Sequence, residues 1–143
     1  MDKLLRYFSI ARKAGLLELG EEDTGAAVRG GKARVVFLAA DASDNALRRA
    51  QGFVHGRDVP LLRIDRKKED ISGATGKGGC SMAAVTDVGL ADSMLSVLAA
   101  EDPQRYAEAA AALEKRHAKA DKRRAEAKAH AINKKIGKRR TAI

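Results

Sequence analysis

The chain has 143 residues, of which 45% are hydrophobic, and a formal net charge of +9. That length and composition suit one domain with a modest core, and no apolar run is long enough for a membrane-spanning helix. A single cysteine excludes an intramolecular disulfide and a multi-thiolate zinc site, and the N-terminal stretch is charged rather than apolar, so we expect a cytoplasmic protein without a signal peptide.

The first hundred residues alternate between helical and strand patterns. Apolar residues at three- and four-residue spacing predict a helix over 3–14, with Gly15 as its C-terminal cap. The next predicted elements, in chain order, are a strand at 16–19, a helix at 21–29, a strand at 34–40, a helix at 45–54, a strand at 59–64, a helix at 66–72, a strand at 82–86 and a helix at 90–99. Asp41 and Ser43 are expected to cap the helix at 45–54. The alternation predicts an α/β fold, a three-layer α-β-α sandwich with a roughly four-stranded mixed sheet.

Charge divides the chain near residue 102. Residues 1–102 hold 15 Lys and Arg and 15 Asp and Glu, whereas residues 103–143 hold 13 Lys and Arg and four Asp and Glu, so the whole excess of +9 lies after residue 102. We therefore predict a domain at 1–100 and a basic, Ala/Lys/Arg-rich helical or partly disordered tail at 101–143. A neutral body with a basic appendage is typical of proteins that bind nucleic acid.

The tail itself begins with good helix signals. Asp102 suits the N-cap and Pro103 the first helical position, and strong helix formers follow to about residue 132. Tyr106, Ala110 and Leu113 form its main apolar patch. The first turns are therefore expected to dock on the body, while the remainder projects into solvent or becomes ordered on a partner.

The stretch GATGKGGC at 73–80 resembles a phosphate-binding loop only in composition. Such loops need four residues between the first glycine and Gly-Lys, and then Ser or Thr. Here only two residues separate Gly73 from Gly76, and Gly78 follows Lys77. Cys80 would need a neighbouring base to act as a nucleophile, but the histidines lie in the tail or at a helix end. The sequence thus favours a non-catalytic protein, without a cofactor or metal, over an NTP-using enzyme.

Three stretches, in order, resemble one known family. They are KLLRYFSIARKAGLLELGEEDTGAAVRGGKARVVFLAADASDN at 3–45, PLLRID at 60–65 and KEDISGATGKGGCSMAAVTD at 68–87. Their order and spacing resemble the ribosomal kink-turn-binding superfamily, called L-seven-Ae/L-thirty-e, and within it the bacterial YlxQ-like branch. The resemblance covers about residues 3–98. It implies an α-β-α sandwich that binds folded RNA, often a sharply bent kink-turn.

The resemblance also implies where RNA would bind. In that family the start of the second helix enters the bend with Gly-x-Asn-Glu and, three residues later, Lys. Gly20, Glu22, Asp23 and Ala26 occupy those positions here, so only the glycine is kept. Asn both donates and accepts hydrogen bonds whereas ionised Glu only accepts, and Ala26 removes a positive charge. The implied contacts are Gly20, Glu21, Glu22 and Asp23, partly through their backbone N–H groups.

The family's second contact is a loop that packs on a flipped-out base, and it corresponds to residues 73–82 here. Lys77 is its expected phosphate contact, and Cys80 and Met82 are its few apolar side chains. The other candidate RNA contacts are basic residues outside this loop: Lys32, Arg34, Lys122, Arg123, Arg124, Lys134 and Lys135. We expect a monomer whose partner is ribosomal or other structured RNA. The alternative is a protein-interaction module that the tail tethers to RNA non-specifically.

Overall fold

The computed structural model describes the backbone of residues 2–141 and the side chains of residues 2–134. The elements are α1 (Lys3–Lys13), β1 (Leu17–Leu19), α2 (Glu21–Arg29), β2 (Val35–Leu38), α3 (Asp44–Val54), β3 (Leu61–Arg63), α4 (Lys68–Thr75), β4 (Met82–Val85), α5 (Val88–Glu101) and α6 (Pro103–Thr141). Within the described chain, every predicted helix and strand is present, and the boundaries of most lie within two residues of the prediction.

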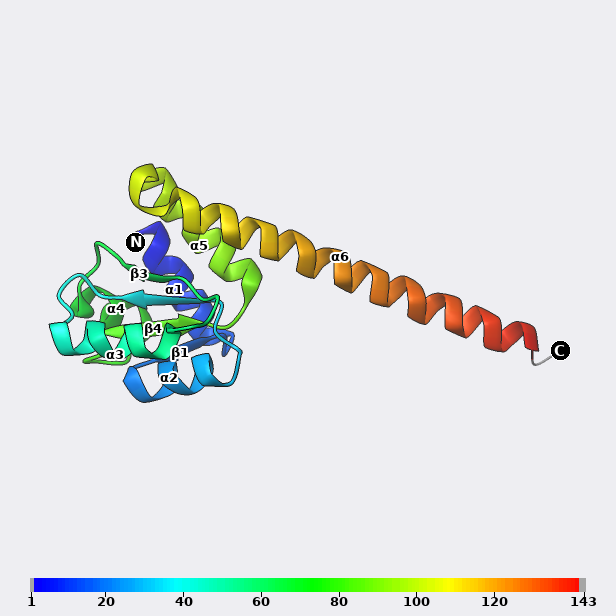
Figure 1. Cartoon of the computed structure of the whole chain (residues 1–143), viewed down its shortest axis with the longest axis horizontal. Helices are drawn as coiled ribbons and strands as arrows, with labels where there is room; N and C mark the ends of the chain where they lie inside the picture. The colour runs from blue at the N-terminus through cyan, green and yellow to red at the C-terminus, as the bar shows by residue number, and fades with distance from the viewer. Residues whose placement is uncertain (1, 142–143) are drawn as a thin grey trace.

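The four strands form one mixed sheet in the order β1-β4-β2-β3. β4 runs antiparallel to both β1 and β2, while β2 and β3 are parallel. Alternate side chains of β2 face opposite layers: Phe37 packs with α1 and α5, and Val36 packs with α2 and α3. Helices thus cover both faces of the sheet, as Figure 1 shows for α2 and α3 on one side and α1 and α5 on the other. The α-β-α fold class is confirmed.

Two features near α4 differ from the sequence prediction. Asp41 does not cap the helix that follows it, because its carboxylate accepts the backbone N–H of Lys68 at 2.9 Å, at the start of α4. Ser43 alone caps α3, through the N–H of Ala46. The helix α4 also continues to Thr75, and Gly76 ends it with a left-handed φ of 80°. The first three residues of GATGKGGC are therefore helical, and the loop is confined to its second half.

α6 docks on the body from its start to about Ala120. Tyr106 and Leu113 are buried in the main core, with 2% and 0% of their surface exposed, and α5 is their principal neighbour. The hydroxyl of Tyr106 donates to the carbonyl of Arg63 at 2.7 Å, which fixes the helix across the end of β3. Every described residue from 121 to 134 is exposed, and Figure 1 shows this part projecting away from the body. The first turns dock as expected, and of the two alternatives for the remainder the structure has the projecting helix. α6 runs to Thr141 rather than to about residue 132.

Candidate RNA interface

The start of α2 and the loop before β4 lie together at one end of the sheet. Gly20 adopts a φ of 94°, in the range that favours glycine, and its N–H donates to the carbonyl of Met82 at 3.0 Å. A Cβ at Gly20 would lie 3.9 Å from the sulfur of Cys80. No side chain caps α2 within the described structure, so its first N–H groups are available to a ligand.

Lys77 bridges these two segments. Its ammonium donates to the carbonyl of Leu19 at 3.3 Å and lies 3.8 Å from the carboxylate of Asp23. Both charged side chains are about half exposed, so this pair contributes little stability and an RNA phosphate can compete for the lysine. The structure thus brings Gly20, Asp23 and Lys77 into one surface, which sequence separation alone did not require.

The acidic residues give this surface a mixed charge. Glu21 forms an ion pair with Arg49 of α3, and this pairing partly offsets the negative charge that Glu21 presents to a ligand. Glu22 is exposed on the first turn of α2. An RNA phosphate approaching the α2 N-terminus is therefore attracted by the helix dipole and by Lys77 but repelled by Glu22 and Asp23.

Cys80 and Met82 do not belong to the exposed part of this surface. Cys80 is 5% exposed and its thiol donates to the carbonyl of Gly78 at 3.7 Å. Met82 is 1% exposed and packs with Leu38 and Ala50 beneath α3. Both side chains point into the core in this structure, so their contact with a flipped-out base remains a prediction. The exposed tip is instead Lys77, Gly78 and Gly79.

Lys32 and Arg34 lie at the opposite end of the sheet from Lys77. Lys32 is exposed beside Glu18 and Asp23 in a hollow along α2, of about 240 Å³. Arg34 is also exposed, and it faces a cleft whose other wall is α6. The two candidates thus differ in their surroundings. Lys32 shares its hollow with carboxylates, whereas Arg34 shares its cleft mainly with basic residues.

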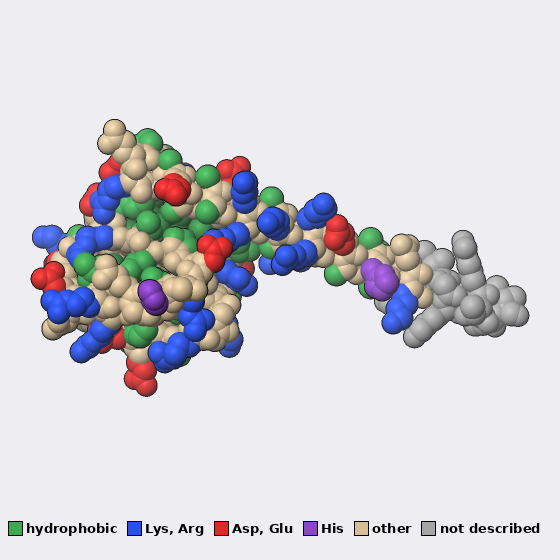
Figure 2. All heavy atoms as spheres, in the orientation of Figure 1, with side chains coloured by type: hydrophobic (Ala, Val, Ile, Leu, Met, Phe, Trp, Pro, Cys, Tyr) green, Lys and Arg blue, Asp and Glu red, His purple; other side chains and the backbone are tan. Residues whose placement is uncertain are grey.

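The tail candidates are exposed on α6. Arg123 and Arg124 border a cleft against the body, whereas Lys122 and Lys134 do not line it. Lys135 lies outside the residues whose side chains the structure describes. Figure 2 shows basic side chains along α6 from the point where it leaves the body, with few acidic ones between them. This arrangement presents positive charge to solvent over several turns, as a polyanion-binding helix requires.

Two basic residues of α6 were not among the predicted contacts. Arg116 and Lys119 line the same cleft as Arg34, beside Arg123. Arg116 lies three residues before Lys119, and Lys119 lies four residues before Arg123, so the three share one helix face, which is a signal present in the sequence. Which face meets the body could not be read from that spacing.

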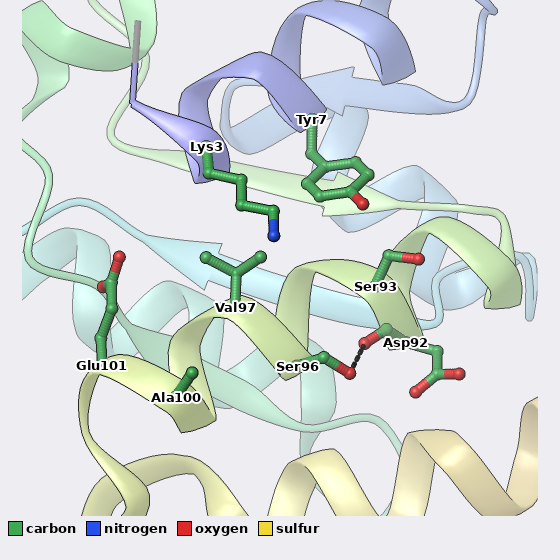
Figure 3. A pocket seen from close by; sticks show the side chains of 8 residues that line it. All are labelled: Lys3, Tyr7, Asp92, Ser93, Ser96, Val97, Ala100 and Glu101. Atoms are coloured by element: carbon green, nitrogen blue, oxygen red, sulfur yellow. Dashed lines mark hydrogen bonds between the residues drawn. The ribbon is translucent and has the colours of Figure 1, made fainter.

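A surface hollow of about 510 Å³ lies between α1 and α5 (Figure 3). Lys3 and Tyr7 reach over it from α1, while Asp92, Ser93 and Ser96 line it from α5. The hydroxyl of Ser96 donates to the carbonyl of Asp92 within the same helix, at 3.0 Å, so it is not paired with a base. Among the described residues, no hydrogen bond joins Ser93 or Ser96 of this groove to a basic side chain.

In the part of the chain that the structure describes, no three His, Cys, Asp or Glu side chains gather as metal ligands would. No described helix has both the length and the apolar character that crossing a bilayer demands.

Comparison with known proteins gives one curated relative and many similar folds. No protein-family model matches the chain. Over 68 residues the sequence is 34% identical to the RNA-binding protein YlxQ of Enterococcus faecium, a match that spans 48% of this chain and 66% of that protein, just under two thirds of its length. A solved structure of a protein with unknown function from Bacillus halodurans C aligns with a TM-score of 0.63 and 23% identity, over 68% of this chain and 97% of that one. The second likeness concerns the fold, and the first is a partial similarity to an RNA-binding protein.

Proposed function

We propose that this protein is a non-catalytic RNA-binding protein. The observation that carries the proposal is the placement of charge: a body of net charge zero bears a projecting helix with an excess of +9. Among the described residues beyond 120, no basic side chain pairs with an acidic group of the body, and RNA phosphates supply the complementary charge. The partial similarity to RNA-binding protein YlxQ supports the same partner.

The body contributes shape recognition in this proposal. Gly20 and the N–H groups at the start of α2 approach the RNA backbone, and Lys77 exchanges Asp23 for a phosphate. The target is structured RNA with a widened groove, as in a kink-turn, within the ribosome or another folded RNA. The tail adds affinity that depends on charge and not on sequence.

Binding titrations with the full chain test this proposal. A labelled kink-turn RNA and an unbent duplex of equal length are each titrated at about 50 and about 200 mM salt, and the anisotropy of the label reports binding. We expect both RNAs to bind with a steep salt dependence and the kink-turn to bind more tightly. Equal affinity for the two RNAs removes shape recognition and leaves the tail alone. Absence of binding to both at low salt contradicts RNA binding altogether.

A second candidate function is a protein-interaction module that the tail tethers to RNA. The acidic pair Glu22 and Asp23 favours it, since Lys77 is the one basic group that contacts either of them among the described residues. Restoring the resembled family's residues with Glu22→Asn and Ala26→Lys separates the two candidates. If the double variant gains tight kink-turn binding that the natural protein lacks altogether, the body is not a kink-turn reader and the second candidate stands.

A further inference from the structure

A basic cleft lies where α6 passes the far end of the sheet. Its volume is about 290 Å³, and its walls are the start of β2, the turn from β4 into α5, and α6. The basic side chains that line it come from both the body and the tail: Arg34, Arg116, Lys119, Arg123 and Arg124. It lies beyond the C-terminal end of β4, whereas Gly20 pairs with Met82 at the strand's beginning. The cleft is therefore separate from the α2 surface.

Neighbouring carboxylates neutralise this cluster only in part. Asp87, the acidic residue that lines the cleft, already accepts the N–H of Leu90 at 2.9 Å as the N-cap of α5. Arg116 pairs at 2.6 Å with Asp58, a side chain that is 94% exposed. This rim pair is weak because solvent screens it.

Three of the other four basic residues of the cleft have no carboxylate partner within the described chain. Among the side chains that the structure describes, Arg34, Lys119 and Arg123 form no ion pair, and Arg124 is 3.9 Å from Asp121. Gathering like charges in one concave site raises the free energy of the folded protein unless an anion enters it.

The helix face that carries these residues turns toward the body. Lys119 lies three residues after Arg116, and Arg123 lies seven residues after it, so the three share one face of the helix. Ala120, between them, is half-buried against the main core. A charged face that is merely solvated would point away from the body, but this one meets Arg34 across the cleft.

Buried contacts also hold the α6 wall of the cleft against the body. Leu113 is fully buried three residues before Arg116, and His117 contacts Asp92 of α5 at 2.8 Å. The part of α6 from Leu113 to Ala120 is therefore held against the body without a ligand, which positions the start of the cleft's α6 wall. A site that is preorganised in this way loses little entropy when it binds.

We propose that this cleft is an RNA-backbone clamp, in which Arg34 of the body and Lys119 and Arg123 of α6 grip neighbouring phosphates. The inference rests on the RNA binding proposed above. Guanidinium groups suit the task because they bind phosphate oxygens with two parallel hydrogen bonds. The four residues of β4 span roughly 13 Å, so one RNA can reach both the clamp and the α2 surface.

A matched pair of double variants tests the clamp. Arg34→Gln with Arg123→Gln removes two charges from the cleft, and Lys122→Gln with Lys128→Gln removes two exposed charges of α6 that do not line it. A labelled RNA hairpin is titrated with each variant at about 50 and about 200 mM salt. We expect the cleft variant to weaken binding at least about tenfold and to reduce the salt slope by about two. The control should weaken binding only about two- to threefold.

Several results overturn the clamp. Equal losses in both variants mean that only the number of charges matters, and then the proposed function stands while the clamp fails. If the natural protein shows no salt-dependent RNA binding, the proposed function itself fails. If inorganic phosphate at the same phosphate concentration raises the melting temperature as much as the hairpin does, the cleft is a small-anion site. Without RNA the cleft variant should melt no lower than the natural protein, since its substitutions relieve repulsion; a lower value assigns the two arginines a structural role instead.

Discussion

The docking of α6 on the body depends on Leu113, and its removal should be costly. Leu113 is 0% exposed and belongs to the main core beside Tyr106. Leu113→Ala deletes three buried carbons, and such substitutions cost about 2–5 kcal/mol. We expect about 2–3 kcal/mol, because α6 packs on one side only and can move inward to reduce the cavity. That loss is large beside a total stability of about 5–15 kcal/mol.

Urea denaturation followed by circular dichroism measures this loss, with Ile132→Ala as the matched control. Ile132 is 50% exposed beyond the docked turns, so its truncation should change the free energy of unfolding by no more than about 0.5 kcal/mol. The reasoning is refuted if Leu113→Ala costs less than about 1 kcal/mol, or if the two variants are equally stable. Either result would mean that α6 does not dock through its buried face.

Three further predictions concern polar groups. Thr24 is fully buried and its hydroxyl has no partner among the described residues, so Thr24→Val should raise the free energy of unfolding by about 1 kcal/mol in urea denaturation; a loss of that size would contradict it. Tyr106→Phe should cost about 1 kcal/mol in the same assay, since it removes the bond to the carbonyl of Arg63; no change would show that this bond contributes nothing. His117 lies between Asp92 and Asp121, and the hydrogen bond with Asp92 raises its pKa although nearby Arg124 opposes this. The stability that protonated His117 contributes to the fold is therefore complete below the ordinary pKa near 6.5, and it is lost as the pH rises through the raised pKa. Thermal melts across this range should show the loss, and His117→Gln should abolish it; an unchanged pH profile in the variant would refute the assignment.

The regular elements of the body could be predicted because their patterns are local. The apolar run at 34–40 contains a strand that is buried on both faces, and the three- and four-residue spacing at 3–14 gives a helix with Phe8 in the core. The alternation of helices and strands then restricts the fold to few arrangements. The docked patch of α6 was likewise visible, since Tyr106 and Leu113 stand out among alanines and charges.

Apart from the ends of α4 and α6, the failures involve contacts between distant segments. Asp41 looks like the cap of the next helix, yet it caps α4, 27 residues away. Met82 begins β4 as predicted, but its side chain, expected to be exposed beside the loop, points beneath α3. The clamp joins Arg34 to residues more than 80 positions later, and only the docking of α6 reveals that they face each other.

Chemical-shift mapping of backbone amides tests the central claim most directly. The full, ¹⁵N-labelled protein is titrated with a kink-turn RNA, and shifts are followed residue by residue. The proposed function predicts the largest body shifts at Gly20–Asp23 and Lys77–Gly79, together with shifts along the basic face of α6. Shifts confined to α6, with the amides of α2 and of the loop before β4 unchanged, would contradict RNA recognition by the body.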